Sequence, residues 1–182
     1  MNKIITENKR GYNLPSISTE VHVPNSLEIQ VGNLLHERGL KLVLAESCTG
    51  GLLGSRITDV PGSSDYFLGS VVAYAYEAKV ALLGVSWDTL NTKGAVSQET
   101  VLAMARGARD AMKADVAMAV SGIAGPGGGT PEKPVGTTWI ALVTAEGEIA
   151  QLFHFSSGDR EKNKSLAADA ALQLLLDYLQ QN

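Results

Sequence analysis

The sequence predicts an α/β fold, a three-layer α/β/α sandwich in which helices cover both faces of a central mixed sheet. Segments with helical periodicity alternate with short apolar segments along most of the chain, and this alternation is typical of a sheet covered on both faces. Near the C-terminus, two apolar segments follow one another around a short polar turn. That pair predicts an antiparallel hairpin, which makes the sheet mixed.

The first half of the chain alternates between helical and strand patterns. Apolar residues at helical spacing predict a helix over residues 25–39, with an Asn at its start and a Gly at its end. The apolar residues 41–45 predict a strand, and residues 51–58 a second helix. The β-branched and aromatic residues of segment 67–76 favour a strand, and segment 77–83 has the composition of a short helix.

The second half continues this alternation and ends in the hairpin. A Ser cap, with Gln and Glu in the first turn, predicts a helix over residues 97–113. Residues 115–120 predict a buried strand, and the many glycines of residues 122–129 predict a loop. The remaining expected elements are two strands at 135–144 and 148–155, joined around Glu146 and Gly147, and a long amphipathic helix at 159–179.

Length and composition predict one folded unit. A chain of 182 residues, 45% of them apolar, contains enough material for one sizeable core. Residues 1–24 show neither helical nor strand periodicity, so we expect an extended or mobile arm there. We expect residues 25–182 to form a single domain.

Charge and cysteine content exclude several classes of function. Fifteen basic and nineteen acidic residues give a net charge of -4, which provides no large positive field for a nucleic acid. A single cysteine cannot form an internal disulfide, and no Cys or His spacing suits zinc. No apolar segment reaches the roughly 20 residues that cross a bilayer, and the N-terminus has no signal-like apolar core. We therefore expect a cytoplasmic protein that binds neither nucleic acid, membrane nor structural metal.

Three polar or glycine-rich turns follow predicted strands, after Ala45, Tyr74 and Val120. Because ligand sites of α/β sheets collect at strand ends, these turns are expected to converge at one edge of the sheet.

The first of these turns contains a candidate nucleophile, Ser47. N–H groups near the start of the following helix would stabilise a developing oxyanion, so we expect the turn to contact substrate. The alternative is that Ser47 or Thr49 only caps the helix. Cys48 is a rival nucleophile, because thiolates attack more readily than hydroxyls. The expected substrate-binding residues of this turn are Glu46, Cys48, Thr49 and Gly50.

A serine nucleophile needs a base, and no histidine of this chain lies in a recognisable motif. Lysine acts as a base when burial and nearby positive charge lower its pKa, and Lys79 is the candidate. Tyr74 precedes it by five residues across a strand-to-helix turn, where it would relay the proton or fix the ammonium group. The alternative for Lys79 is a solvated lysine on a surface helix.

The glycine-rich segment 121–130 allows the main chain to approach a ligand closely, as phosphate-binding loops do. It matches neither a Walker motif nor a dinucleotide fingerprint, and a flexible loop without ligand is the alternative. Arg160 lies near the start of the last helix, where a cation is unfavourable without an anionic partner. The expected substrate-binding residues here are Ser121, Gly122, Gly125, Gly127, Gly128, Thr130 and Arg160.

Six ordered blocks together resemble the CinA C-terminal domain family: AESCTGG (45–51), AYAYEAKVALLGV (73–85), GAVSQE (94–99), SGIAGPGGGT (121–130), KPVGTTWIA (133–141) and GDR (158–160). The resemblance implies nicotinamide mononucleotide amidase activity, which yields nicotinate mononucleotide and ammonia in pyridine-nucleotide salvage. It also implies a homodimer that needs no cofactor. By resemblance, Ser47, Tyr74 and Lys79 are catalytic, and Ser121 and Arg160 contact the substrate.

Three positions depart from the family pattern. Residue 121 is Ser where Thr is frequent, Tyr74 is followed by Ala-Tyr-Glu where Ser-Asn-Glu is common, and Asn163-Lys164 stands where an arginine is familiar. These departures leave open a catalytically weak nucleotide-binding or regulatory module. The family's historical name suggests a role in competence or DNA damage, but the acidic charge balance argues against direct DNA contact.

Overall fold

The computed structural model describes residues 26–181, so the predicted N-terminal arm lies outside the described residues. Within this range, no helix is both long and apolar enough to cross a membrane. The elements, in chain order, are α1 (Leu27–Arg38), β1 (Leu42–Glu46), α2 (Leu52–Thr58), η1 (Ser63–Asp65), β2 (Phe67–Val72), α3 (Tyr76–Leu83), α4 (Trp87–Lys93), α5 (Gln98–Met112), β3 (Val116–Gly122), β4 (Thr137–Val143), β5 (Glu148–His154) and α6 (Arg160–Gln181).

The sheet has five strands in the order β2-β1-β3-β4-β5. Strand β1 pairs in parallel with both β2 and β3. The pairs β3–β4 and β4–β5 are antiparallel, so the predicted mixed sheet and its C-terminal hairpin are confirmed. Because β1, β2 and β3 run in the same direction, their carboxyl ends meet at one edge of the sheet, and the segments that follow them meet there as well.

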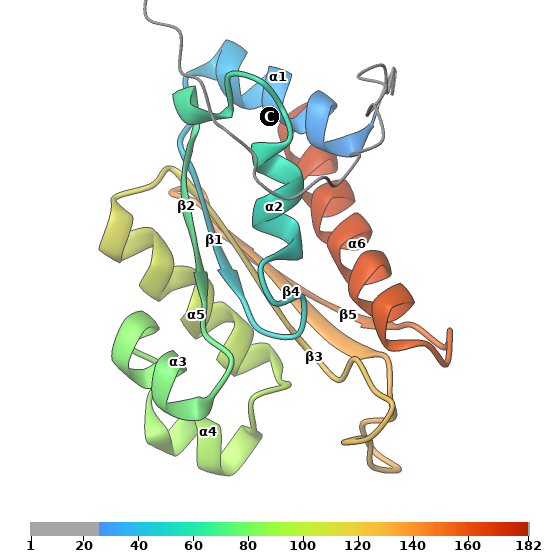
Figure 1. Cartoon of the computed structure of the whole chain (residues 1–182). Coiled ribbons are helices and arrows are strands. Elements are labelled where there is room, and N and C mark those ends of the chain that lie inside the picture. Colours follow the sequence, from blue (N-terminus) through green and yellow to red (C-terminus); the bar gives the residue numbers. More distant parts are fainter. Residues whose placement is uncertain (1–25, 182) are drawn as a thin grey trace, which may run out of the picture.

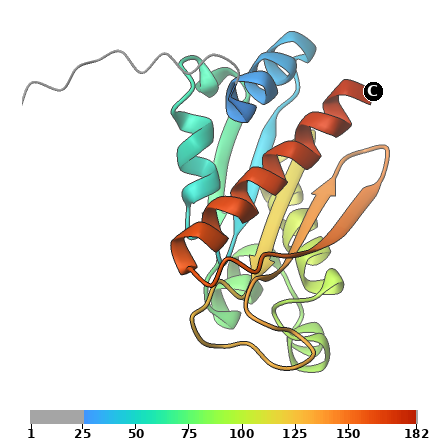
Figure 2. The same cartoon turned by 90° about the vertical axis from the view of Figure 1, so that its right-hand side faces the viewer.

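Helices cover both faces of the sheet, as predicted. Helices α1, α2 and α6 lie on one face and α3, α4 and α5 on the other (Figure 1), and the long α6 crosses its face obliquely (Figure 2). Side chains alternate along β1, so Leu42 and Leu44 enter the core beneath α6 and Val43 and Ala45 the core beneath α5. The two cores give the three layers of the sandwich.

Most elements lie within two residues of their predicted bounds, but β2 does not. The strand ends at Val72, whereas the sequence pattern predicted strand up to Tyr76. After Val72 the chain leaves the ladder: the N–H of Ala73 donates to the carbonyl of Glu46, and Tyr76 already begins α3. Aromatic residues at 74 and 76 misled the prediction, because the side chains of both are exposed rather than packed on a sheet.

Helix α4 was not predicted, because seven residues are too few to show a periodic apolar pattern. Its start is nevertheless marked in the sequence. The hydroxyl of Ser86 accepts a hydrogen bond from the N–H of Thr89 at 3.0 Å, which is the usual arrangement of a serine cap. The longer helix α5 begins in the same way, with Ser97 accepting from Thr100, and this cap was predicted.

Helix α5 approaches the end of α3 so closely that only glycine fits at position 107. A Cβ atom on Gly107 would lie 1.8 Å from the carbonyl oxygen of Leu83. Glycine inside a helix ordinarily costs about 1 kcal/mol relative to alanine. Here that cost is offset by the close contact between the two helices, which holds α3 against α5.

We therefore expect Gly107→Ala to destabilise the fold by about 1–3 kcal/mol, although the same change in an ordinary helix is stabilising. Gly147→Ala is the control, because a Cβ there would meet no atom within 4 Å. Urea unfolding measures both variants. A Gly107→Ala protein as stable as wild type would contradict the proposed packing.

Candidate functional site

Ser47 and Lys79 meet at the carboxyl edge of the parallel strands. Ser47 directly follows β1, and its N–H donates to the carbonyl of Val120 near the end of β3. Lys79 lies on α3, which follows β2, and its Nζ lies 2.9 Å from Oγ of Ser47. The serine is 8% exposed and the lysine 0%. The predicted convergence of the strand-end turns is confirmed for this pair.

The amine of Lys79 is surrounded by main-chain carbonyls rather than by carboxylates. It donates to the carbonyls of Ala73 at 2.6 Å and Tyr74 at 3.1 Å, and it forms no ion pair with any described residue. Burial disfavours the charged form and lowers the pKa of Lys79 to about 8. In the neutral form, two N–H bonds suffice for the two carbonyls, and the lone pair faces the hydroxyl of Ser47.

Cys48, the rival nucleophile, is turned away from this pair. Its side chain is 7% exposed and belongs to the core between the sheet and α6. Burial raises the pKa of the Cys48 thiol to about 12. Because the thiolate and not the thiol is the reactive form, a thiol in this environment is a poor nucleophile at neutral pH.

The carboxylate of Glu46 accepts hydrogen bonds from the turn and does not face the space beside Ser47 where a substrate would bind. The carboxylate is fully buried, and both of its oxygens are occupied by donors from the turn, from α2 and from β2. The side chain of Thr49 is fully buried as well, so neither of these expected substrate-binding residues presents a free polar group on its side chain. The donors are Thr49 Oγ1 (2.7 Å), Gly51 N (3.0 Å), Leu53 N (3.1 Å), Gly54 N (2.8 Å) and Ser70 Oγ (2.8 Å).

These bonds decide which N–H groups of the turn remain for a ligand. Gly50 and Gly51 adopt φ angles of 63° and 96°, so the predicted tight glycine turn is present. Gly50 donates its N–H to the carbonyl of Ser47, and Gly51 donates to Glu46. The N–H groups of Cys48 and Thr49 are therefore the candidates that could meet a developing oxyanion beside Ser47.

Arg160 joins the glycine-rich loop to Tyr74. One guanidinium nitrogen donates to the carbonyl of Gly125 at 2.7 Å, and the other donates to the hydroxyl of Tyr74 at 2.8 Å. The phenol of Tyr74, 59% exposed, is thus held by Arg160, and only its main-chain carbonyl contacts Lys79. Tyr74 lies at the site as predicted, but the relay through its hydroxyl is not the arrangement present.

Part of the remaining glycine-rich segment is held by hydrogen bonds and close packing, and part of it is exposed to solvent. Ser121 is 1% exposed, and its hydroxyl donates to the carbonyl of Ala95 at 2.7 Å. Gly122 closes β3, where a Cβ would lie 2.5 Å from the hydroxyl oxygen of Thr138. Thr130 accepts from the N–H of Lys133 in a local turn. Gly127 and Gly128 lie in an exposed part of the loop, with φ of 85° at Gly128.

Two residues of α6 contribute to the site without having been expected there. Asn163 is 3% exposed, and its amide donates to the carbonyl of Ala124 at 3.0 Å, which anchors the loop from a second point. Lys164 brings its Nζ to 3.8 Å from the position that a Cβ on Gly50 would take. The signal in the sequence is the spacing of four residues between Arg160 and Lys164, which places both cations on one face of a helix.

The comparisons with known proteins identify the family of this chain. The sequence model of the CinA C-terminal domain family matches residues 24–179 of this chain. The chain belongs to the CinA C-terminal domain family. A CinA-like protein of Geobacter metallireducens is 50% identical over 150 residues, 82% of this chain and 36% of the relative. A CinA-like protein of Geotalea daltonii is 51% identical over 150 residues, again 82% of this chain and 36% of the relative.

Solved structures of the CinA family share the fold. The competence/damage inducible protein CihA of Agrobacterium tumefaciens superposes with a TM-score of 0.80 at 37% identity, covering 86% of this chain and 97% of that one. A CinA superfamily protein of Klebsiella pneumoniae gives a TM-score of 0.82 at 34% identity, with the same coverage. This CinA-family chain spans about a third of the length of the curated relatives it matches.

We expect Glu46→Gln to destabilise the protein by about 3 kcal/mol, because an amide nitrogen would face N–H and hydroxyl donors that now meet a carboxylate. Glu37→Gln, on the exposed side of α1, is the matched control and should change stability by less than about 0.5 kcal/mol. Chemical unfolding of both variants checks the difference. Equal stability of the two would exclude a structural role for the Glu46 carboxylate.

Proposed function

We propose that this CinA-family chain is a nicotinamide mononucleotide amidase that hydrolyses the carboxamide through a serine nucleophile. The observation that carries the proposal is the buried pair of Ser47 and Lys79, with 2.9 Å between Oγ and Nζ. A hydroxyl becomes a useful nucleophile when an adjacent base accepts its proton. An amine with a pKa of about 8 and no carboxylate partner is suited to that role.

The first step transfers the proton of Ser47 to neutral Lys79 while Oγ forms a bond to the carboxamide carbon. The carbonyls of Ala73 and Tyr74 hold the amine in place, so its lone pair already faces the hydroxyl. The negative charge that develops on the amide oxygen would be met by the N–H groups of Cys48 and Thr49. No cofactor takes part in this step.

The second step returns the proton. The ammonium of Lys79 donates it to the departing nitrogen, the C–N bond breaks, and ammonia leaves an acyl ester on Ser47. Water then attacks the ester with Lys79 again as base, and nicotinate mononucleotide is released with Ser47 restored. The same lysine serves both halves of the reaction as base and acid.

The phosphate of the nucleotide would be held by cations at the start of α6. Arg160 lies beside the carbonyl of Gly125, and Lys164 lies one turn later beside Gly50. A phosphate between them would give both cations an anionic partner. Positioning the nucleotide in this way raises the effective concentration of the carboxamide at Ser47.

We expect purified protein to release ammonia and nicotinate mononucleotide from nicotinamide mononucleotide. Ser47→Ala should lower kcat/KM by about 10³-fold or more, because the covalent route is lost. Cys48→Ala is the neighbouring control and should keep activity within about 10-fold, because its thiol is buried and protonated. A coupled ammonia assay and chromatography of the nucleotides measure the effects.

Two outcomes would contradict this assignment. Activity that survives Ser47→Ala and disappears in Cys48→Ala would make the thiol the nucleophile. Binding of the nucleotide by wild-type protein without release of ammonia would favour the catalytically weak or regulatory module. Thermal unfolding of each variant verifies that a loss of activity does not come from a loss of fold.

The pH dependence of kcat/KM reports the protonation of Lys79. Only the neutral amine accepts a proton, so activity should fall as pH decreases through the pKa of about 8, and at pH 7 about one-tenth of the molecules hold the neutral form. Initial rates between pH 6 and 9.5 test this. A rate that is independent of pH across that range would exclude Lys79 as the base.

The pH dependence of the free energy of unfolding gives a second measurement of the protonation of Lys79, independent of activity. The folded-state pKa of Lys79 lies below the ordinary value of 10.5, so between about pH 8 and 10.5 the unfolded chain binds more protons. The free energy of unfolding of wild type should therefore rise with pH in that window relative to Lys79→Met. Parallel curves for the two proteins would contradict the lowered pKa.

A further inference from the structure

Residues 93–96, which we call the α4–α5 junction, present four consecutive carbonyls that all accept hydrogen bonds from side chains. Ser97 and Thr100 donate locally, from the start of α5. Ser121 donates from the end of β3, and Lys133 donates from the end of the glycine-rich loop. A main chain held from several sides is a fixed point to which the loop can be attached.

The junction lies beside the proposed base. The N–H of Ala95 donates to the hydroxyl of Tyr76 at 3.3 Å, and Tyr76 precedes Lys79 by about one turn of α3. The carbonyl of Ala95 accepts from Ser121, at the end of the strand whose main chain binds the N–H of Ser47. The junction is therefore attached to α3 and to β3, the two elements that hold the proposed catalytic pair in place.

Lys133 connects the glycine-rich loop to this junction. Its side chain is partly buried, and Nζ lies 3.0 Å from the carbonyl oxygen of Lys93 and 2.8 Å from that of Val96. Its main chain closes a tight turn, because the N–H of Thr130 donates to the carbonyl of Lys133 at 2.9 Å and the N–H of Lys133 donates back to the hydroxyl of Thr130. One side chain therefore ties the turn at 130–133 to the α4–α5 junction.

Helix α6 holds the loop on its other side. Arg160 donates to the carbonyl of Gly125, and Asn163 donates to the carbonyl of Ala124. Figure 2 shows the loop running along the lower edge of the molecule, between the start of α6 and α4. Residues 126–129, between the two anchors, are exposed. The path of the loop is therefore set by α6 at one end and by Lys133 at the other.

The two arms of the loop pack against each other. A Cβ on Gly125 would lie 2.6 Å from Cγ1 of Val135, and a Cβ on Gly129 would lie 2.7 Å from the main-chain nitrogen of Val135. Val135 follows Lys133 by two residues. Because contacts this close leave no room for slack, a displacement of the arm that contains Lys133 would displace Gly125 as well.

We propose that Lys133 is a positioning residue for nucleotide binding. By holding the loop on the α4–α5 junction, it keeps the carbonyl of Gly125 where this carbonyl orients Arg160 toward a phosphate. The inference rests on the proposed function, in which Arg160 binds the phosphate. The ammonium group of Lys133 is already bound by two carbonyls, so Lys133 acts through the loop. A loop ordered in advance lowers the entropic cost of binding, and the effect falls on KM rather than on kcat.

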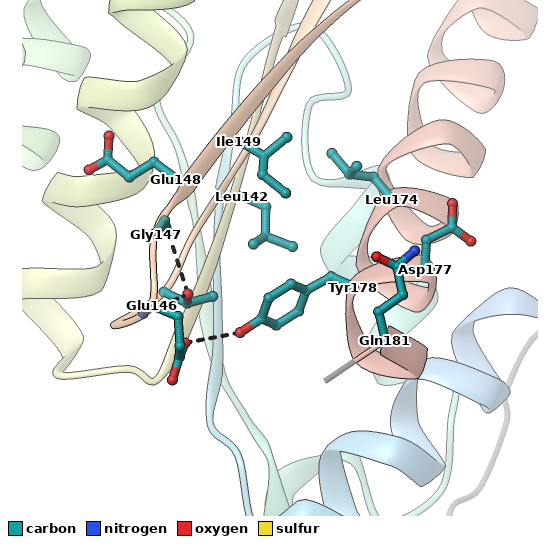
Figure 3. A pocket seen from close by; sticks show the side chains of 10 residues that line it. Leu142, Glu146, Gly147, Glu148, Ile149, Leu174, Asp177, Tyr178 and Gln181 are labelled. Carbon is teal, nitrogen blue, oxygen red and sulfur yellow. Dashed lines mark hydrogen bonds between the residues drawn. The ribbon is translucent and has the colours of Figure 1, made fainter.

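Another hollow has the volume for a small ligand but the wrong charge for a phosphate. It measures about 450 Å³ and lies between the β4–β5 hairpin and the last turns of α6 (Figure 3). The described residues that line it include the carboxylates of Glu146, Glu148 and Asp177 and neither lysine nor arginine. Negative charge repels a phosphate, and Tyr178 already donates to Glu146. The cations at the start of α6, beside the loop, are therefore the favoured place for the nucleotide.

Lys133→Met removes both hydrogen bonds to the junction and keeps a side chain of similar length. We expect its KM for nicotinamide mononucleotide to rise about 10-fold and its kcat to change by less than about 3-fold. Lys113→Met is the matched control, because this exposed lysine lies at the end of α5 and its loss should change neither constant by more than about 2-fold. An unchanged KM in Lys133→Met, or a loss confined to kcat, would overturn the proposal.

A double-mutant cycle separates positioning from direct contact with the phosphate. If Lys133 acts through Arg160, adding Lys133→Met to Arg160→Met should raise KM by less than about 2-fold beyond the value for Arg160→Met alone. If the effects of the two substitutions instead multiply, Lys133 contacts the phosphate itself and the positioning role is wrong.

Hydrogen exchange followed by NMR tests the anchor without any need for activity. The amides of Thr130 and Gly136 donate hydrogen bonds within the loop, and in Lys133→Met they should exchange about 10-fold faster than in wild type. The amides of β1 should stay protected, which verifies that the variant is folded. Equal exchange of the loop amides in the two proteins would overturn the inference even where amidase activity is confirmed.

The inference can also be tested if the proposed function fails. Should wild-type protein release no ammonia, the Kd for nicotinamide mononucleotide from calorimetry replaces KM as the measured constant. Lys133→Met should then raise this Kd about 10-fold, and Lys113→Met should leave it unchanged. A Kd that does not respond to Lys133→Met would refute the positioning role.

Discussion

The proposed chemistry depends on keeping the amine of Lys79 buried without a counter-charge. A lysine in such surroundings normally pairs with a carboxylate, and the pair would hold its pKa high. Lys79 is surrounded instead by the carbonyls of Ala73 and Tyr74 and by the hydroxyl of Ser47. These groups accept the N–H bonds of the amine but carry no full negative charge, so burial still lowers its pKa. Burying the amine reduces stability, and in the proposed mechanism it provides a base close to neutral pH.

The carboxylate that could have neutralised Lys79 is used elsewhere. Glu46 is the residue immediately before Ser47, yet the alternation of β1 turns it toward α2, where it binds the N–H groups of the turn. Helix α2 starts at Leu52, and its N-cap residue Gly51 has no side chain that could cap it, so Glu46 takes over that function. The carboxylate of Glu46 therefore fixes the turn that contains Ser47, the proposed nucleophile, and makes no hydrogen bond to Lys79, the proposed base.

Sequence patterns predicted the layers of the fold, because these follow from local periodicity. The main pair of the site was predicted from the strand-end turns, from the need of a serine nucleophile for a base, and from the family resemblance. Strand-end turns of parallel strands must meet at one edge, and this brought Ser47 and Lys79 together in the prediction. The roles of Tyr74 and Ser121 were not predictable in the same way. Their hydroxyls bind Arg160 and the carbonyl of Ala95, which are 86 and 26 residues away in the chain. Nothing local in the sequence marks such partners.

The period of two along β1 also explains why the hydroxyl of Ser47 rather than the thiol of Cys48 lies beside Lys79. Ser47 continues the row of Val43 and Ala45, which faces the α3 and α5 side, where Lys79 lies. Cys48 continues the opposite row and enters the core beneath α6, where burial keeps it protonated. The side chains of these two adjacent residues therefore point to opposite sides of the sheet. A shift of one residue in this turn would exchange them, and the bonds from Glu46 to the turn and α2 oppose that shift.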